Sequence, residues 1–216
     1  MSPEAHGALA HHFDDLEQQH EAAALGMWAF LVTEIMFFGG LFTGYAVYRH
    51  SYPQAWAQGS HHLSILWGGF NTAVLLGSSL TMALAVRSAQ VNQQRDIVRY
   101  LLATIGLGVV FLGVKAIEYA EKFAHHLVPG LHFHAPQDAP QMQLFFSFYF
   151  AMTGVHALHM VIGIGILATL LWMARRGRFS AEHHPWLELS GLYWHLVDIV
   201  WIFLFPLLYL IDRHGS

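Results

Sequence analysis

The chain has no cysteine and few charged residues. None of its 216 residues is Cys, and Asp, Glu, Lys and Arg together make up 11% of them. Without cysteine there is no disulfide, no thiolate catalysis and no Cys-ligated zinc or iron–sulfur centre. The small share of charge, with 55% hydrophobic residues and a mean hydropathy of +0.41, indicates an integral membrane protein. The formal net charge of −4 gives no basic surface that would favour nucleic acid as a partner.

Five apolar runs are long enough to cross a membrane as helices, which takes about 20 residues each. Polar and proline-containing segments separate them, such as the polar run 87–96 and the segment 129–140. No internal repeat is visible. The sequence therefore predicts an all-α integral membrane protein, with a polar N-terminal tail at 1–21 and one five-helix domain at 22–216. The predicted spans are 22–48, 63–86, 97–120, 142–174 and 187–211.

Basic residues are unevenly divided between the two sides of this predicted bundle. The side that holds the N-terminus receives more of them than the other side. Because an excess of Lys and Arg marks the cytoplasmic side, we expect the N-terminus inside and the C-terminus outside. The N-terminal side has Arg87, Arg95, Arg99, Arg175, Arg176 and Arg178, and the other side has Arg49, Lys122 and Arg213.

One carboxylate falls in the middle of the first predicted span. In the segment MWAFLVTEIMFFGGLF, Glu34 is far enough from the start of the span to reach mid-bilayer at about 1.5 Å per residue. Ionisable groups at that depth are costly and are often functional. Two interpretations stay open, a hydrogen-bonded packing carboxyl and a proton-relay or regulatory carboxyl that faces a subunit interface.

Three charged residues share one face of the third predicted span. Lys115, Glu118 and Lys122 are spaced i, i+3 and i+7, so opposite charges are neighbours on the helix. This spacing favours a charge-compensated face near the water boundary, toward which Lys122 extends. The alternative is a contact with a lipid headgroup or with another subunit.

The last two predicted spans carry paired ionisable residues. His156 and His159 in GVHALHM, like His195 and Asp198 in WHLVD, are spaced i, i+3 and share a helix face. Such groups need a protein partner or a function in hydrocarbon. A metal site between facing helices is one hypothesis, but neither helix has a Glu-x-x-His pair. The favoured interpretation is a structural hydrogen-bonding network across the helix interface, with no metal and no catalytic residue.

The 17 histidines raise a second metal hypothesis, the membrane di-iron desaturases and hydroxylases. Their histidine boxes gather on one membrane face, whereas the doublets here are predicted on both faces and do not converge. Haem binding in the manner of a cytochrome b bundle needs two histidines several turns apart in one span, which no span has. We therefore interpret these histidines as solvated loop residues or weak adventitious metal sites. His11, His12, His183 and His184 are predicted inside, and His61, His62, His125, His126, His132 and His134 outside.

Five blocks follow one another along nearly the whole chain after Glu21. They are LVTEIMFFGGLF, FNTAVLLGSSLTMALA, LGVVFLGVKAIEYAEKF, FYFAMTGVHALHMVIG and YWHLVDIVWIFLFPLLY. In this order they resemble the third subunit of haem–copper respiratory oxidases, the cytochrome c oxidase subunit III family. The first block is similar to its glutamate-bearing helix, the second to its Asn-Thr helix, the third to its Glu-Tyr helix, and the others to its last two helices.

The resemblance implies an accessory core subunit of a terminal oxidase in the cytoplasmic (inner) membrane of a bacterium. Its main contact is expected to be oxidase subunit I, with subunit II as a further partner. Haem and copper are expected in those partners and not in this chain, which is expected to bind structural phospholipids. Glu34 is expected to support proton uptake by subunit I and its protection from turnover inactivation. The other residues that the resemblance matches to the family's motifs are Glu118, His156, His159, His195 and Asp198.

One departure from the family concerns the number of spans. Many members have seven, with a lipid-filled cleft between the first two and the other five, so lipid sites in that cleft would here need two helices from another subunit. Five-span forms also occur among quinol oxidases and relatives associated with nitric oxide reductases. Glu34 favours an aa3-type cytochrome c oxidase, with a quinol oxidase or nitric-oxide-reductase-associated subunit as the alternative. Membership in a larger respiratory supercomplex stays open. The alternative of a different class is an independent membrane metalloenzyme that uses the intramembrane His and Asp residues.

Overall fold

The computed structural model describes residues 13, 15–130, 133, 139–177, 179 and 185–212. These residues form helices α1 (Leu16–Ser51), α2 (Pro53–His61), α3 (Ile65–Gln90), α4 (Gln94–Ala124), α5 (Ala139–Arg175) and α6 (Pro185–Tyr209). Five stretches are long and apolar enough to cross a membrane: Glu17–Ser51, Ile65–Gln90, Gln94–Ala124, Pro140–Arg175 and Pro185–Tyr209. The prediction of an all-α membrane protein with five spans is confirmed.

The first helix begins inside the segment that was predicted as a polar tail. The carboxylate of Asp15 accepts a hydrogen bond of 2.7 Å from the backbone N–H of Gln18, as an N-cap residue does. This contact satisfies one of the N–H groups that the first helical turn leaves without a partner. The polar segment before Glu21 therefore supplies the cap and first turn of α1.

The short helix α2 was not predicted, because Pro53 was interpreted as a break between spans. Proline is well tolerated in the first turn of a helix, where its missing N–H costs nothing, and α2 begins at Pro53. The helix buries Trp56 completely, with its ring centroid 6.0 Å from that of Tyr45 and 5.8 Å from that of Phe145. A Cβ on Gly59 would lie 2.3 Å from the Phe145 ring, so α2 and α5 approach closely there.

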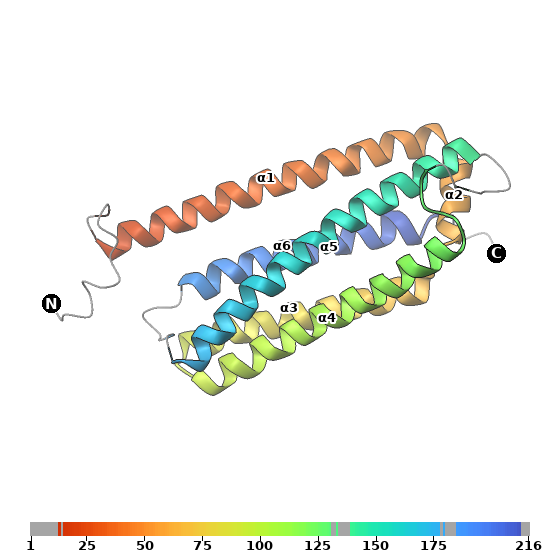
Figure 1. Ribbon diagram of the computed structural model, residues 1–216. Coiled ribbons are helices and arrows are strands. Elements are labelled where there is room, and N and C mark those ends of the chain that lie inside the picture. The colour runs from red at the N-terminus through yellow and green to blue at the C-terminus, as the bar shows by residue number, and fades with distance from the viewer. Residues whose placement is uncertain are drawn as a thin grey trace. The chain divides into compact units, whose positions relative to one another are not determined.

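The chain divides into two compact units, Met1–Phe37 and Phe38–Ser216, and α1 contributes to both. In the second unit, α3 packs against α4 and α6, while α5 packs against the same two helices. Successive helices from α3 to α6 run in alternate directions (Figure 1). The four helices therefore surround one interior, and α2 packs against α5 and α6.

Small residues allow close packing around the tryptophan of the WHLVD motif. Trp194 is 1% exposed. A Cβ on Gly163 of α5 would lie 2.9 Å from its ring, and a Cβ on Gly108 of α4 would lie 3.0 Å from it. Close approach at small residues is a usual way for membrane helices to pack. Gly106 and Gly165 are different, because an added Cβ would meet nothing within 4 Å.

The described basic residues lie near the helix ends that the predicted topology assigned to them. Those expected inside are Arg87 in α3, Arg95 and Arg99 in α4, Arg175 in α5 and Arg176 directly after it. Arg49 in α1 and Lys122 in α4 were expected outside. Arg178 and Arg213 lie outside the described residues. Which end faces the cytoplasm stays a prediction.

Candidate functional site

An ion pair between Lys115 and Glu118 is buried inside the bundle. Both residues belong to α4, one helical turn apart, and Lys115 Nζ lies 3.2 Å from Glu118 Oε2. The side chains are only 4% and 1% exposed. The opposite charges are neighbours, as their spacing predicted. The predicted contact of these two residues with lipid or another subunit is wrong, because both side chains are buried inside the chain.

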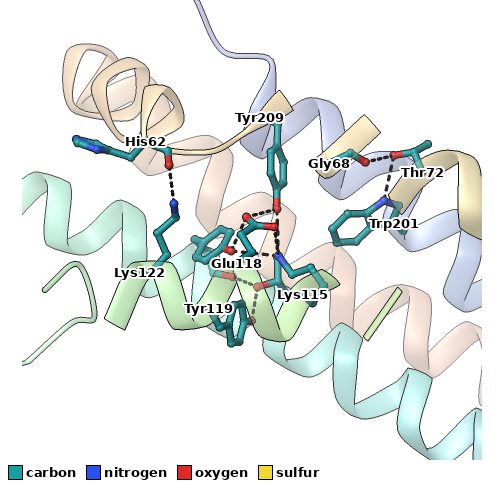
Figure 2. A network of polar contacts seen from close by, with 11 residues as sticks. His62, Gly68, Thr72, Lys115, Glu118, Tyr119, Lys122, Trp201 and Tyr209 are labelled. Carbon is teal, nitrogen blue, oxygen red and sulfur yellow. Dashed lines mark hydrogen bonds and ion pairs between the residues drawn. The ribbon is translucent and has the colours of Figure 1, made fainter. Parts of the chain in front are cut away.

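Two tyrosines complete this ion pair from neighbouring helices. The hydroxyls of Tyr149 in α5 and Tyr209 in α6 donate to Glu118 Oε1, at 2.8 Å and 2.6 Å. Lys115 Nζ in turn donates to both tyrosine oxygens, at 3.1 Å and 3.0 Å. Figure 2 shows Lys115, Glu118 and Tyr209 converging from α4 and α6. We call Lys115, Glu118, Tyr149 and Tyr209 the charged layer.

The ammonium group of Lys115 also lies among aromatic rings. Its nitrogen is 4.8 Å from the ring centroid of Tyr149, 5.1 Å from that of Tyr119 and 5.5 Å from that of Trp201. Ring faces attract cations, and more strongly where water is excluded. The charged layer thus satisfies its own charges and joins α4, α5 and α6.

The third predicted charge, Lys122, binds the backbone near the end of α2. Its Nζ donates to the carbonyl oxygen of His62 at 2.7 Å, and the residue is 5% exposed (Figure 2). This bond ties α4 to the connection between α2 and α3 in place of the expected contact with lipid or a partner. The pKa of His62 is lower than its ordinary value. Partial burial is the main cause, and the positive charge of Lys122 is the second. His125 and His61 act in the same direction.

Of the predicted network among His156, His159, His195 and Asp198, the described hydrogen bond of His195 goes to α3 and not to the histidines of α5. His195 Nδ1 lies 2.7 Å from Ser79 Oγ of α3. His159 Nδ1 lies 2.8 Å from the carbonyl oxygen of Val155 in its own helix. The physical reason is the order of the helices. Because α6 packs between α3 and α5, the side of α6 that carries His195 faces α3 and not the α5 histidines.

His156 is buried without a hydrogen-bond partner among the described residues, whereas the buried carboxyl of Asp198 lies beside the Ser79 hydroxyl of α3. His156 is 0% exposed and Asp198 is 3% exposed. The imidazole of His156 packs against aromatic rings instead, with centroids 5.4 Å from Phe111 and 5.3 Å from Trp201. Asn71 of α3 is also buried without a hydrogen-bond partner among the described residues, and the sequence analysis did not single it out.

Hydroxyl groups of α3 bind the tryptophans of α6. Trp194 Nε1 donates to Ser78 Oγ at 3.0 Å, and Trp201 Nε1 donates to Thr72 Oγ1 at 3.1 Å. Thr72 itself donates to the carbonyl oxygen of Gly68 at 2.8 Å (Figure 2). Together with Ser79, these residues were missed, although hydroxyls within an apolar span are a signal of helix–helix contacts.

Glu34 lies in α1, midway between the ends of the candidate span Glu17–Ser51. It belongs to the first compact unit, whereas the charged layer belongs to the second.

The described residues contain no group of three or more His, Asp or Glu side chains that could hold a metal ion. Of the histidine doublets, His61 and His62 are at the end of α2, and His125 and His126 directly follow α4. His11, His12, His132, His134, His183 and His184 lie outside the described residues.

The fold and these buried contacts define a multi-pass membrane protein whose intramembrane polar groups mainly join its own helices. Residues 9–212 match the model of the family described as cytochrome c oxidase subunit III. The chain belongs to this family of respiratory oxidase subunits, which associate with other subunits of the oxidase.

Curated relatives cover nearly the whole chain. It is 34% identical over 209 residues to cytochrome c oxidase subunit 3 of Synechocystis sp., covering 96% of this chain and 80% of the relative. Identity is 30% over 201 residues to cytochrome c oxidase subunit 3 of Thermostichus vulcanus, covering 93% and 92%. It is also 30% over 205 residues to cytochrome bo(3) ubiquinol oxidase subunit 3 of Pseudomonas aeruginosa, covering 94% and 91%. The relatives thus include subunits of both cytochrome c and quinol oxidases.

Proposed function

We propose that this chain is the accessory subunit III of a haem–copper terminal oxidase of the aa3-type cytochrome c class. It stabilises the catalytic subunit I and supports its proton uptake, while haem and copper are held by the partner subunits. The observation that carries the proposal is the family match over residues 9–212. The proposed location is the cytoplasmic membrane of a bacterium, with the N-terminus inside.

The charged layer supports a scaffolding role in this complex. A group that exchanges protons with a substrate has to be reached by that substrate, whereas Lys115 and Glu118 are almost fully buried and bind each other. Their remaining hydrogen bonds go to Tyr149 and Tyr209 on two other helices. We therefore assign this layer to the rigidity of the bundle and not to chemistry.

The outer surface of the second unit supports contacts with lipid and with subunits I and II. Large apolar side chains project outward from several helices, including Leu80 of α3 (61% exposed), Leu158 of α5 (56%) and Phe203 of α6 (56%). In a bilayer, such side chains are covered by acyl chains or by neighbouring helices. This chemistry fits both the expected structural phospholipids and an oxidase partner.

Glu34 is the residue that we propose for support of proton uptake. Its midpoint position in Glu17–Ser51 places a titratable group far from both ends of the helix. A carboxyl at such a depth is expensive to keep unless it has a partner or a function. We expect it to face the partner subunit, as the family resemblance implies.

The test is the turnover of the purified oxidase with Glu34→Ala in this chain. We expect normal assembly and a nearly normal initial rate, followed by faster loss of activity during sustained turnover. The matched control is Thr33→Ala, which removes a methyl group and a hydroxyl that donates to the carbonyl oxygen of Phe30 in the same helix. An equal loss of initial and sustained rates, or no loss in either, would contradict the proposed role of Glu34.

A quinol oxidase is the second candidate, because quinol oxidase subunits are as similar to the chain as several cytochrome c oxidase subunits. The two candidates differ in the electron donor. Oxygen consumption by the purified complex with reduced cytochrome c, compared with a reduced quinol, separates them. Native gels of the solubilised membrane then show whether the complex belongs to a larger respiratory assembly.

A further inference from the structure

Two polar side chains meet at the outer side of the contact between α3 and α6. His195 Nδ1 of α6 lies 2.7 Å from Ser79 Oγ of α3, and both residues are half-buried. The Ser79 hydroxyl also lies beside the carboxyl of Asp198, which is buried. Ser79 and His195 therefore connect an interior carboxyl with the outer surface of the bundle. We call these two residues the polar pair.

The polar pair lies far from both ends of its two helices. His195 comes ten residues after the start of the candidate span Pro185–Tyr209 and fourteen residues before its end. At about 1.5 Å per residue, these separations are about 15 Å and 21 Å. Ser79 likewise comes fourteen residues after the start of Ile65–Gln90 and eleven before its end. Because the hydrocarbon core of a bilayer is about 30 Å thick, the pair is at a depth where lipid offers only acyl chains.

One atom of the polar pair has no partner in the part of the chain that the structure describes. The second ring nitrogen of His195, Nε2, makes no hydrogen bond there, and it is not enclosed by those residues either. In a neutral imidazole one ring nitrogen donates and the other accepts, so Nε2 does one or the other. Acyl chains do neither, and an unsatisfied polar group is costly in hydrocarbon. Nε2 therefore calls for a polar group from outside this chain.

Exposed apolar side chains flank the polar pair on both helices. Ile199 and Ile202 follow His195 at i+4 and i+7, so they share its helix face, and they are 49% and 41% exposed. Leu76 precedes Ser79 by three residues on α3 and is 52% exposed. An apolar surface with a polar spot in its middle is typical of membrane helix contacts, where polar side chains bind each other across the interface. We call these five residues the α3/α6 face.

We propose that the α3/α6 face is a docking surface for a membrane helix of another oxidase subunit, which places a hydroxyl or amide side chain against Nε2 of His195. Hydroxyls and amides can both donate and accept, so they fit either state of this nitrogen. A lipid does not fit, because its polar atoms lie at the membrane surface. The inference rests on the proposed function, which supplies the partner subunits, and adds to it the surface and the residue that bind one of them.

The first test is photo-crosslinking in the intact complex, with a photoreactive benzoylphenylalanine in place of Ile199. We expect a covalent product with another oxidase subunit, which mass spectrometry maps to a membrane span that carries a polar residue. The matched control is the same replacement of Val109, which is 54% exposed on α4, across the bundle from α6. Products of the Ile199 variant with lipid alone, with a second copy of this chain or within this chain overturn the proposal. Equal capture of the same span from Val109 overturns it as well.

The second test measures how tightly the complex retains variants of this chain in a detergent titration. His195→Phe keeps a ring but removes Nε2, and we expect a roughly 3- to 30-fold weaker retention, as for one hydrogen bond between membrane helices. His195→Gln supplies an amide in place of the imidazole and should recover part of the loss. Ser79→Ala removes only the bond inside the chain and leaves Nε2 in place, so its effect should be smaller. An equal loss in Ser79→Ala and His195→Phe, or none in His195→Phe, contradicts docking at Nε2.

A matched control for retention is Thr169→Val, whose exposed hydroxyl donates to the carbonyl oxygen of Gly165 in its own helix. We expect unchanged retention in this variant. If a His195 variant fails to assemble, the crosslinking still decides the question, because it keeps His195. Failure of the proposed function is distinguishable: a chain that purifies without any oxidase subunit contradicts both proposals, whereas a chain that co-purifies but captures no other subunit from Ile199 contradicts only the docking surface.

Discussion

The buried ion pair gives a prediction that the structure makes quantitative. We compare Glu118→Leu with the double variant Lys115→Met/Glu118→Leu. The single change leaves the Lys115 ammonium in the interior without its carboxylate, and it removes the acceptor of the Tyr149 and Tyr209 hydroxyls. The double change removes both charges. We expect the double variant to be more stable than Glu118→Leu.

The size of the effect follows from the burial and from the distance between the charges. At 3.2 Å and an effective dielectric constant of about 20, the two charges attract by about 5 kcal/mol. Removing each charge from water costs several kcal/mol, so the intact pair contributes little net stability. Loss of one partner costs about 3–5 kcal/mol, which corresponds to a change of roughly 100- to 5,000-fold in an equilibrium constant.

The assay is backbone hydrogen exchange of α4 in the purified complex, measured by mass spectrometry. Glu118→Leu is expected to accelerate exchange in α4 by roughly 100-fold or more where exchange reports opening of the bundle. Glu121→Leu is the matched control, because Glu121 is an exposed carboxylate one turn further along the same helix. Unchanged exchange in Glu118→Leu, or faster exchange in the double variant than in the single one, refutes the reasoning.

Two further predictions concern the end of the bundle near α2. Gly59→Ala places a Cβ 2.3 Å from the buried Phe145 ring and should lower stability by about 1–3 kcal/mol. Gly113→Ala, where nothing lies within 4 Å, should not lower it, and equal thermal midpoints of the two variants would contradict the close contact. His62 has a lowered pKa in the folded chain, so the unfolded chain takes up its proton first as the pH falls. Stability should therefore be fully present above about pH 6.5 and should decrease below it. His62→Asn should flatten this part of a pH series of thermal midpoints, and an unchanged slope would count against the assignment to His62.

The membrane spans could be predicted from the sequence because lipid imposes a simple rule. A single run of about 20 apolar residues can span the bilayer with all its backbone N–H and C=O groups hydrogen-bonded only as a helix. The rule says nothing about short helices at the membrane surface. For this reason α2 was missed, although Pro53 and the buried Trp56 belong to a regular helix. The start of α1 was missed for a similar reason. The helix begins where the Asp15 side chain caps it, and a hydropathy pattern does not show such a cap.

The polar residues were identified from the sequence, but their partners were not. Spacing shows that His195 and Asp198 share a helix face, yet the rotation of that face toward α3 is decided by the packing of the whole bundle. For Glu118, the spacing correctly predicted Lys115 as the neighbour in its own helix. Its tyrosine partners come from α5 and α6 and leave no local pattern in the sequence.

The central claim is that the chain is a subunit of a haem–copper oxidase whose cofactors lie in other subunits. The most direct measurement is purification of the tagged chain from its native membrane in mild detergent, with a subunit list and a reduced-minus-oxidised optical spectrum before and after the chain is dissociated. The account predicts co-purification with oxidase subunits I and II, and a haem spectrum that stays with those subunits when the chain is removed. Isolation of a stable chain without oxidase subunits, or haem that remains on the dissociated chain, would contradict the account.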